Sequence, residues 1–348
     1  MKRTGAVNQR WDVCVFGVGP AGAATAMRLA DLGMTVIALE RPAARKPWGG
    51  ESFTGAIRGP LASLGLWEGF CAAGHVAGYE QRTAWGESGT ADSLFNPHGN
   101  AWHVDRDRFN LDLRAAVEQR CIPMPCYLSL DRLERDGDRW RLALDGSRVI
   151  SARYLVDATG RTGALARRLG ARPRIHDRLV ALTALVPRNV AFDHAMLIST
   201  APDGWWYAAP VPRGHVLAYF TDSDLAPRQL ARSMQIVPAN SSFTATRGRE
   251  GWLAVGDACA AHDPLCGWGV HRALANGIRA ADAIGLYLRD GDLSGLDRYD
   301  LHCRDQFDAY LVGLGEHYAY EGRFAASPFW QRRLENSSAK AVGSTSIH

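Results

Sequence analysis

The stretch "DVCVFGVGPAGAATAMRLADLGMTVIALE", residues 12–40, decides the fold of this chain. It opens with DVCVF and closes with MTVIALE, two apolar runs whose length and composition are typical of buried strands. Between these runs, Gly22, Ala26, Leu29 and Ala30 recur at the spacing of one helix face. The stretch therefore predicts a strand, a helix and a second strand, the repeating unit of α/β folds.

Three glycines stand in the turn between the first strand and the helix. Gly17, Gly19 and Gly22 have the spacing G-x-G-x-x-G. The first allows a tight turn, the second lets the backbone approach a pyrophosphate, and the third lets helix and strand pack closely. Glu40 ends the second strand, where a carboxylate can accept hydrogen bonds from a ribose. The pattern predicts a dinucleotide site, with the pyrophosphate at the start of the helix.

The chain then departs from a simple series of strand–helix–strand units. Residues 41–55, RPAARKPWGGESFTG, form a polar, glycine-rich loop. Residues 133–161, LERDGDRWRLALDGSRVISARYLVDATGR, alternate apolar and polar positions around Asp-Gly turns, which is typical of a β-meander. Residues 251–264, GWLAVGDACAAHDP, predict a further strand that ends in Gly-Asp.

The motifs GVGPAG, DATG and GDA…DP…G.G resemble, in order and spacing, those of the FAD-dependent enzymes of the para-hydroxybenzoate hydroxylase superfamily. That superfamily also holds the tryptophan halogenases and the geranylgeranyl reductases. The resemblance implies an α/β fold with an FAD-binding Rossmann-like domain of the glutathione-reductase type, including a β-meander, an antiparallel-sheet substrate domain and C-terminal helices. The expected boundaries are 10–72, 104–172 and 245–290 for the FAD-binding domain, 73–103 and 173–244 for the substrate domain, 291–335 for the C-terminal helical segment, and 336–348 for a disordered tail.

The resemblance also implies roles for individual residues. Glu40 would hold the adenosine ribose, and Asp257 a ribityl hydroxyl. GGES, residues 49–52, resembles a flavin-facing loop of the halogenase branch, and VDRDRFNLDLRAAV, residues 104–117, would place Arg106 near the flavin. The residues expected to contact FAD are Gly17, Gly19, Pro20, Ala21, Gly22, Glu40, Arg41, Gly50, Glu51, Ser52, Arg106, Asp157, Gly160, Gly256, Asp257, Pro264, Gly267, Trp268, Gly269 and Val270.

The stretch "DPLCGWGVHRAL", residues 263–274, combines glycines with bulky residues at the mouth of a helix. Its glycines let the backbone approach the isoalloxazine ring, and the helix from about Val270 would point its positive end at flavin N1 and O2. We expect Trp268 to lie against the flavin or to wall the substrate pocket. Cys266 is interpreted as a packed thiol, with covalent flavin attachment as the alternative.

Activated phenol or indole rings call for a base, and histidine suits that role near neutral pH. We favour His271 because it follows the glycine loop, and Glu51 and Trp268 complete the expected catalytic set. A lone histidine is more often structural, so the choice of base stays open. The other candidates are His75, His98, His103 and His262, with Asp263 as a further acid.

The middle of the chain predicts a sheet that carries the substrate. Residues 178–186, 195–200, 204–211 and 215–222 read as consecutive strands, with PDG and PRG as turn signals. The expected substrate residues are Trp205, Tyr207 and His103. Plain packing remains an equal alternative for Trp205, Trp206 and Tyr207, since strands favour aromatic residues.

These observations predict an FAD-dependent monooxygenase that hydroxylates an electron-rich aromatic ring of the indole or phenol type through a flavin C4a-hydroperoxide. The electrons would come from NAD(P)H or a separate flavin reductase, and the oxygen from O2. Residues 316–333, EHYAYEGRFAASPFWQRR, resemble the tail of a small branch that hydroxylates tryptophan in peptide or protein precursors, in part for quinone-cofactor maturation. The expected partner is therefore a small aromatic substrate or an aromatic residue of such a precursor.

Three alternatives remain open. GWWYAAP resembles the halogenase signature G-W-x-W-x-I-P, but Tyr207 and Ala209 depart from it. Halogenases need a lysine between flavin and substrate, and residues 47–339 contain none; an arginine cannot replace that amine because it stays protonated. A geranylgeranyl-type flavin reductase, and a non-enzymatic FAD-binding partner of a precursor peptide, are the other two.

The composition limits further classes. With 348 residues and a net charge of +4, the chain has no strong basic patch, and we expect no nucleic-acid partner. No charge-free run is long enough for a transmembrane segment, and the N-terminus does not resemble a signal peptide, so a cytoplasmic location is expected. The seven cysteines are scattered, and C-x4-C at Cys121 and Cys126 lacks a second pair, so no metal site is expected.

Overall fold

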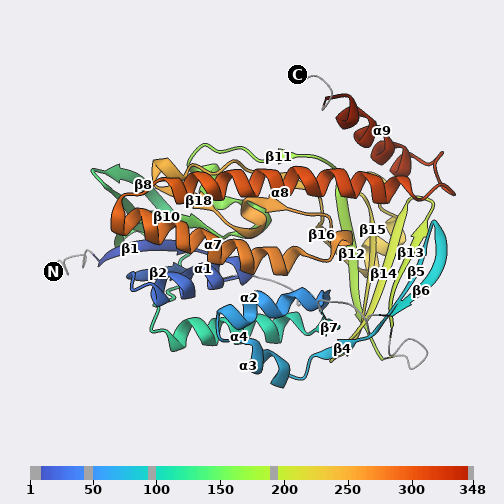
Figure 1. The fold of residues 1–348 in the computed structure, drawn as a ribbon, viewed down its shortest axis with the longest axis horizontal. Helices are drawn as coiled ribbons and strands as arrows, with labels where there is room; N and C mark the ends of the chain where they lie inside the picture. The colour runs from blue at the N-terminus through green and yellow to red at the C-terminus, as the bar shows by residue number, and fades with distance from the viewer. Residues whose placement is uncertain (1–8, 43–49, 93–98, 189–194, 344–348) are drawn as a thin grey trace.

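The computed structural model describes residues 9–42, 50–92, 99–188 and 195–343. His98, one of the candidate bases, lies outside these described residues. Figure 1 shows an elongated molecule with a sheet toward each end and the helix α8 (Ser294–Ala319) running alongside both. The site must therefore be assembled from elements that come from distant parts of the chain.

The first sheet is built on the predicted strand–helix–strand unit. Its central strand β1 (Gln9–Phe16) pairs in parallel with β2 (Val36–Leu39) and with β10 (Arg148–Asp157). On its other edge, β10 has two partners. Its first half pairs antiparallel with β9, and its last three residues pair in parallel with β18. The predicted meander and the predicted Gly-Asp strand are thus confirmed as β8 (Leu130–Asp136), β9 (Arg139–Leu144), β10 and β18 (Trp252–Ala254).

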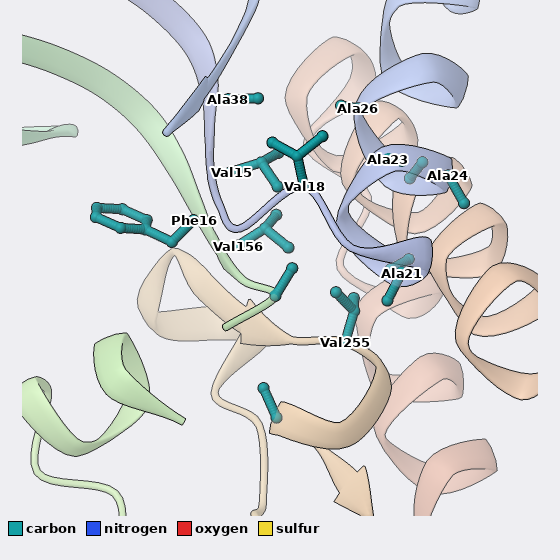
Figure 2. Packing of buried hydrophobic residues seen from close by; sticks show 14 of the residues in the cluster. Val15, Phe16, Val18, Ala21, Ala23, Ala24, Ala26, Ala38, Val156 and Val255 are labelled. Carbon is teal, nitrogen blue, oxygen red and sulfur yellow. The ribbon is translucent and has the colours of Figure 1, made fainter. Parts of the chain in front are cut away.

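Small residues let two helices lie close together on this sheet. The helix α1 (Pro20–Asp31) follows the glycine turn and packs against α7 (Gly269–Asp290). A side-chain carbon added to Gly277 of α7 would lie only 2.6 Å from the carbonyl oxygen of Ala21. In Figure 2, Val15 of β1, Val156 of β10 and Val255, which directly follows β18, gather beside the start of α1. Burial of these apolar side chains fixes the glycine turn against the strand ends.

The second sheet has seven strands in the order β16-β12-β15-β14-β13-β5-β6. The four predicted strands are confirmed, but β12 is not adjacent to β13. Tight turns fold β13, β14 and β15 into a meander, which places β15 next to β12. The sheet is also not wholly antiparallel, because β13 pairs in parallel with β5. Its strands are β5 (Glu80–Trp85), β6 (Glu87–Asp92), β12 (Leu179–Val186), β13 (Ala195–Ala201), β14 (Gly204–Val211), β15 (Gly214–Asp222) and β16 (Gln235–Pro238).

Two small sheets and several short helices connect these parts. Residues 73–103 divide between sheets, because β5 and β6 join the large one while β7 pairs with β3 on one side and with β4 on the other. The short strands are β3 (Glu51–Phe53), β4 (Val76–Gly78), β7 (Ala101–Val104), β11 (Arg174–Ile175), β17 (Ser242–Phe243) and β19 (Ala260–Ala261). The remaining helices of the first half and middle are α2 (Arg58–Ser63), α3 (Trp67–Ala72), α4 (Arg106–Gln119), α5 (Ala164–Arg168) and α6 (Arg228–Ser233).

The C-terminal helices cover one face of the large sheet. The helix α9 (Pro328–Gly343) continues past Asn336, where the composition favoured a disordered tail. Its first turn is anchored by Phe329 and Trp330, which are buried, and an anchored helix extends more readily than an isolated one. Residues 344–348 of the expected tail lie outside the described residues. In the part of the chain that the structure describes, no helix is both long enough and apolar enough to span a bilayer.

Buried aromatic residues fill the space between the large sheet and these helices. We call this set the aromatic cluster. Trp205 stacks on Phe220 with ring centroids 3.9 Å apart, and Trp85 meets Trp205 edge to face. The cluster separates the face of the sheet under α8 and α9 from solvent. Its members are Trp85, Trp205, Phe220, Tyr318, Phe329 and Trp330.

Candidate functional site

The glycine turn before α1 leaves one position open. A side-chain carbon on Gly17 would lie 2.4 Å from the carbonyl oxygen of Ala158, and one on Gly22 would lie 1.9 Å from that of Gly17. Gly17 also has a φ of +99°, which glycine tolerates best. A side-chain carbon on Gly19, in contrast, would meet no atom within 4 Å, and no side chain caps the start of α1. The outward-facing N–H groups beside Gly19 therefore suit an anionic pyrophosphate.

Glu40 is oriented at the end of β2 by two hydrogen-bond donors. One carboxylate oxygen accepts from the backbone N–H of Val18 at 3.0 Å, and the other lies 3.1 Å from Nη2 of Arg114. Arg41 points away and donates to the carbonyl of Leu128 at 3.3 Å. Arg114 was missed from the sequence, although it lies on the predicted arginine-containing helix two turns after Arg106. The half-buried Glu40 remains suited to a ribose.

The side chain of Asp157, at the end of β10, is buried and binds the turn that follows this strand. It has no exposed surface, and its oxygens accept from the N–H and hydroxyl of Thr159, at 2.9 and 2.6 Å, and from the N–H of Ala166 at 2.7 Å. Burial raises the pKa of its carboxyl above the ordinary value. The expected side-chain contact of Asp157 with the cofactor is therefore corrected: these bonds occupy it within the turn. Gly160, just beyond, has a φ of +65° and open space at its side-chain position.

Asp257 is the exposed carboxylate of the second strand end. Gly256 before it has a φ of +57°, and a side-chain carbon there would lie 2.7 Å from that of Ala21. Asp257 lines pockets on both sides and lies 3.4 Å from Nε of Arg161. Arg161 also donates to the carbonyls of Asn240 and His262. Three partners therefore hold Arg161 in place, and Arg161 in turn orients the carboxylate of Asp257.

Residues 263–269, called the 263–269 loop below, lead into α7. Gly267 has a φ of +63°, and a side-chain carbon on Gly269 would meet no atom within 4 Å. Trp268 precedes α7 without capping it, and its ring meets that of His271 edge to face at 4.9 Å. The first turn of α7 is thus open to a ligand atom that carries negative charge. The other predicted contacts differ in exposure: Pro264 is exposed, while the side chain of Val270 is buried in the core.

Cys266 lies within this loop as a packed thiol. Burial raises the pKa of the thiol, and its sulfur is 3.7 Å from Nη1 of Arg272. A protonated thiol is a poor nucleophile, which favours the packing interpretation over covalent attachment.

The segment that begins at Gly50 brings a carboxylate and a guanidinium together. A side-chain carbon on Gly50 would lie 2.5 Å from the carbonyl oxygen of Val104, so this glycine permits close strand packing. Glu51 accepts a hydrogen bond from Arg106, whose Nε donates to Asn110 at 3.1 Å. The pair is partly exposed and fixes a positive charge beside β3.

Three predicted residues meet in one hydrogen-bonded group. The hydroxyl of Ser52 is 2.6 Å from Nδ1 of His103 and 2.7 Å from the hydroxyl of Tyr207. We call Ser52, His103 and Tyr207 the polar trio; it joins β3, β7 and β14. Burial lowers the pKa of His103 to about 4 and raises that of Tyr207, so both side chains are neutral near pH 7. The sequence named all three residues but gave no sign that they touch.

The other candidates lie in packed surroundings. Trp205 is 1% exposed within the aromatic cluster, which favours packing over substrate contact. His75 is buried against Phe70, with ring centroids 4.7 Å apart. Burial lowers the pKa of His262 to about 3, and its ring faces Tyr310 of α8. Within the described residues, no group of three or more histidine, cysteine, aspartate or glutamate side chains could hold a metal ion.

Comparison with known proteins identifies the class. Residues 10–229 match the family model described as FAD binding domain. The chain belongs to this family and is an FAD-dependent oxidoreductase. LodB of Marinomonas mediterranea, whose name places it among the FAD-dependent oxidoreductases, is 27% identical over 93% of this chain and 97% of its own length.

Solved structures share the fold. CmlS, a flavin-dependent halogenase, has a TM-score of 0.80 at 23% identity and covers 97% of this chain and 71% of its own. QhpG, a peptidyl tryptophan dihydroxylase essential for tryptophylquinone cofactor biogenesis, has a TM-score of 0.75 at 22% identity, over 93% of this chain and 79% of its own. At these identities the comparison concerns the architecture.

The geometry of the site fits FAD. Open space lies at the side-chain positions of Gly19, Gly160 and Gly269, while Gly17 and Gly22 are closed by the protein itself. Each open glycine adjoins a helix start or a strand end that would face one part of the dinucleotide. The helices α1 and α7 both begin without a side-chain cap, so their N–H groups can bind the pyrophosphate and the pyrimidine edge of the flavin.

Proposed function

We propose that this enzyme hydroxylates an electron-rich aromatic ring, of the indole or phenol type, within a peptide or protein precursor. The polar trio carries the proposal. It offers a partly buried tyrosine hydroxyl that is held in position from two strands outside the large sheet. A hydroxyl fixed in this way can orient a ring that carries an N–H or O–H group.

The protein residues have separate tasks in this proposal. Tyr207 hydrogen-bonds the polar group of the ring, and Ser52 and His103 fix the direction of its hydroxyl. Since burial lowers the pKa of His103 to about 4, this imidazole orients its neighbours rather than storing a proton. Arg106, held by Glu51, supplies positive charge beside the flavin. Bound and reduced FAD supplies the oxygen-activating chemistry.

The proposed electron and substrate partners are supported by the sequence and the comparisons. G-x-G-x-x-G occurs once as a nucleotide motif, so we propose that NAD(P)H binds transiently or that a separate flavin reductase delivers the electrons; O2 is the oxidant. The peptide-bound substrate is supported by the likeness to QhpG, which acts on peptidyl tryptophan. His271 and Trp268 stay candidates for the flavin side of the pocket, because they adjoin the open start of α7.

Halogenation is the second candidate, favoured by the fold shared with CmlS. It is opposed by the lack of any lysine between residues 47 and 339. An amine that can carry or position the oxidised halide is therefore missing from the whole segment that surrounds the site, and arginine does not replace it.

The test is a turnover assay with mass spectrometry. Purified protein is incubated with FAD, NADH, a flavin reductase and O2, and with a tryptophan peptide, free tryptophan or a phenol. We expect a gain of about 16 or 32 Da on the peptide, in line with flavin-dependent oxygen insertion. A halogenated product that forms only with chloride or bromide would refute hydroxylation. Oxidation of free tryptophan but not of the peptide would refute the precursor substrate.

A further inference from the structure

The 263–269 loop is attached to α8 through a buried aspartate. Asp263 is 2% exposed, and its backbone N–H donates to the hydroxyl of Tyr310 at 2.7 Å. One carboxylate oxygen accepts from the hydroxyl of Tyr318 at 2.8 Å, and the other accepts from the backbone N–H of Leu265 at 2.9 Å. Tyr310 and Tyr318 of α8 thus both bind Asp263, the first residue of the loop. Asp263 in turn fixes the backbone at Leu265.

The direction of these hydrogen bonds is fixed by chemistry. An indole N–H can only donate, and Nε1 of Trp205 lies 3.0 Å from the hydroxyl oxygen of Tyr318. Tyr318 therefore accepts from Trp205 and gives its single proton to Asp263. The chain Trp205, Tyr318, Asp263 runs from β14 of the large sheet through α8 to the loop without a break.

The surroundings make this attachment strong. All three side chains are buried, and burial raises the pKa of Asp263 to about 6. A buried carboxyl that lost its donor would be left unsatisfied, which destabilises by more than an ordinary surface hydrogen bond. The guanidinium of Arg333 lies 5.0 Å from the ring of Tyr318 and adds a favourable charge.

The residues that follow Asp263 differ in how they are held, because Cys266 packs on the core of the first sheet and its sulfur lies 3.7 Å from Nη1 of Arg272. Pro264, Gly267 and Gly269 are exposed, and the nearest atom to a side-chain carbon on Gly267 would be 3.8 Å away. Leu265 is the apolar residue of the loop that packs on the aromatic cluster. Asp263 and Leu265 therefore attach the loop to α8 and the aromatic cluster, while Cys266 attaches it to the core of the first sheet.

We propose that Tyr318 is a positioning residue for the flavin: through Asp263 it holds the 263–269 loop in the conformation that receives the cofactor. Through Trp205 it couples that loop to the sheet proposed to carry the substrate. Figure 1 shows α8 running along both sheets, which is the placement such a link requires. The inference rests on the proposed function only in placing the flavin against this loop.

The expected consequence is a change in the population of the binding-competent loop. If only a fraction of the molecules hold the loop in the binding conformation, the apparent association constant for FAD equals the intrinsic constant multiplied by that fraction. The variant Tyr318→Phe keeps the ring in the cluster and removes only the hydroxyl. We expect it to weaken FAD binding about tenfold, which corresponds to about 1.4 kcal/mol, and to shift the visible spectrum of bound FAD.

A matched control exists in the same cluster. Trp330 is equally buried and donates its indole N–H to the carbonyl of Ala201, at 3.0 Å, away from the loop. Trp330→Phe should lower the melting temperature but leave the FAD affinity and spectrum as in the unaltered protein. In the FAD-free protein, amide exchange of residues 263–269 should speed up in Tyr318→Phe and not in Trp330→Phe.

The outcome that would overturn the proposal is equal behaviour of the two variants: similar losses in melting temperature, with spectrum, affinity and loop exchange unchanged in both. Should Tyr318→Phe fail to fold, Asp263→Ala, which removes the acceptors of the Tyr318 hydroxyl and of the Leu265 N–H, is measured in its place with the same expectations and the same refuting result. Every readout uses FAD alone and no organic substrate. The proposal can therefore fail while hydroxylation stands, and hydroxylation can fail while the proposal stands.

Discussion

The sheet that carries the glycine turn and the sheet that carries the aromatic cluster are packed by opposite means. Around α1 the core is made of alanines, valines and glycines, so backbones approach each other closely. Under α8 and α9 it is made of tryptophans, tyrosines and phenylalanines held by specific hydrogen bonds. In the first region, an atom added at Gly17 or Gly22 would clash with the backbone, whereas in the second region a lost hydrogen-bond partner would leave a buried polar group unsatisfied. Substitutions of these two kinds should therefore separate the regions.

The largest effect is expected from breaking a buried ion pair beside the aromatic cluster. Asp222 is 2% exposed and accepts from Arg333 at 3.0 Å and from Arg332 at 2.8 Å. Asp222→Asn leaves the buried guanidinium of Arg333 without its countercharge, which destabilises by about 4 kcal/mol. Chemical denaturation measures the loss, and FAD should still bind.

Asp224 provides the control for this variant, because it pairs with Arg332 at the exposed surface. Asp224→Asn should change the free energy of unfolding by less than about 1 kcal/mol. Equal losses in the two variants would contradict the distinction between a buried and an exposed pair.

Acidification should lower the stability of the folded protein through protonation linked to His103 of the polar trio. Burial holds the pKa of His103 near 4 in the folded chain, against an ordinary value of 6.5. Below pH 6.5 the His103 imidazole binds a proton in the unfolded chain but stays neutral in the folded chain. The free energy of unfolding that His103 contributes above pH 6.5 is therefore lost as the pH falls toward 4. The contribution is about 3 kcal/mol.

The pH effect is isolated by comparing the unaltered protein with His103→Asn at pH 7 and pH 4.5. The raised pKa of Asp263, about 6, acts with the opposite sign in both proteins and cancels in the difference. The unaltered protein should lose about 2.4 kcal/mol more than the variant between pH 7 and pH 4.5. An identical pH dependence in both would show that His103 titrates normally.

The glycine turn offers a pair of substitutions that differ only in available space. Gly22→Ala puts a carbon 1.9 Å from the carbonyl oxygen of Gly17 and should cost about 2 kcal/mol and most FAD binding. Gly19→Ala meets no protein atom, so it should leave the FAD-free melting temperature unchanged and weaken FAD about tenfold, because the methyl group faces the pyrophosphate. Melting curves with and without FAD distinguish the two; a stability loss in Gly19→Ala would contradict the open position.

The smallest stability change is expected at the centre of the polar trio. Ser52→Ala removes both hydrogen bonds of its hydroxyl and should alter stability by about 1 kcal/mol. FAD binding should persist, but product formation should fall about tenfold because the hydroxyl of Tyr207 loses its orientation. The measurement compares kcat/KM of the variant with that of the unaltered protein. Ser63→Ala, on the exposed face of α2, is the control, and equal rates in the two variants would remove the trio from the proposed mechanism.

The glycine turn, Glu40 and the two strand ends could be predicted because each is local. Their geometry depends on residues a few positions apart, and a G-x-G-x-x-G turn has the same shape in many chains. Asp157 was misjudged for a reason that sequence cannot supply: a carboxylate at a strand end can face outward or bind the next turn, and only the position of Ala166 decides. The order of the large sheet could not be predicted from the sequence either, because turn residues indicate where a chain reverses and not which strands become neighbours.

The sequence by itself determined the class of this protein, because the nucleotide motifs and the spacing of its strands encode backbone geometry directly. Only the tertiary structure decided which side chains act together. Ser52, His103 and Tyr207 are separated by up to 155 residues, and Trp205, Tyr318 and Asp263 by up to 113, so no pattern along the chain reports their contacts. Those contacts arise when burial of apolar surface brings distant strands and helices together, and that burial leaves each polar group with the few partners it can reach.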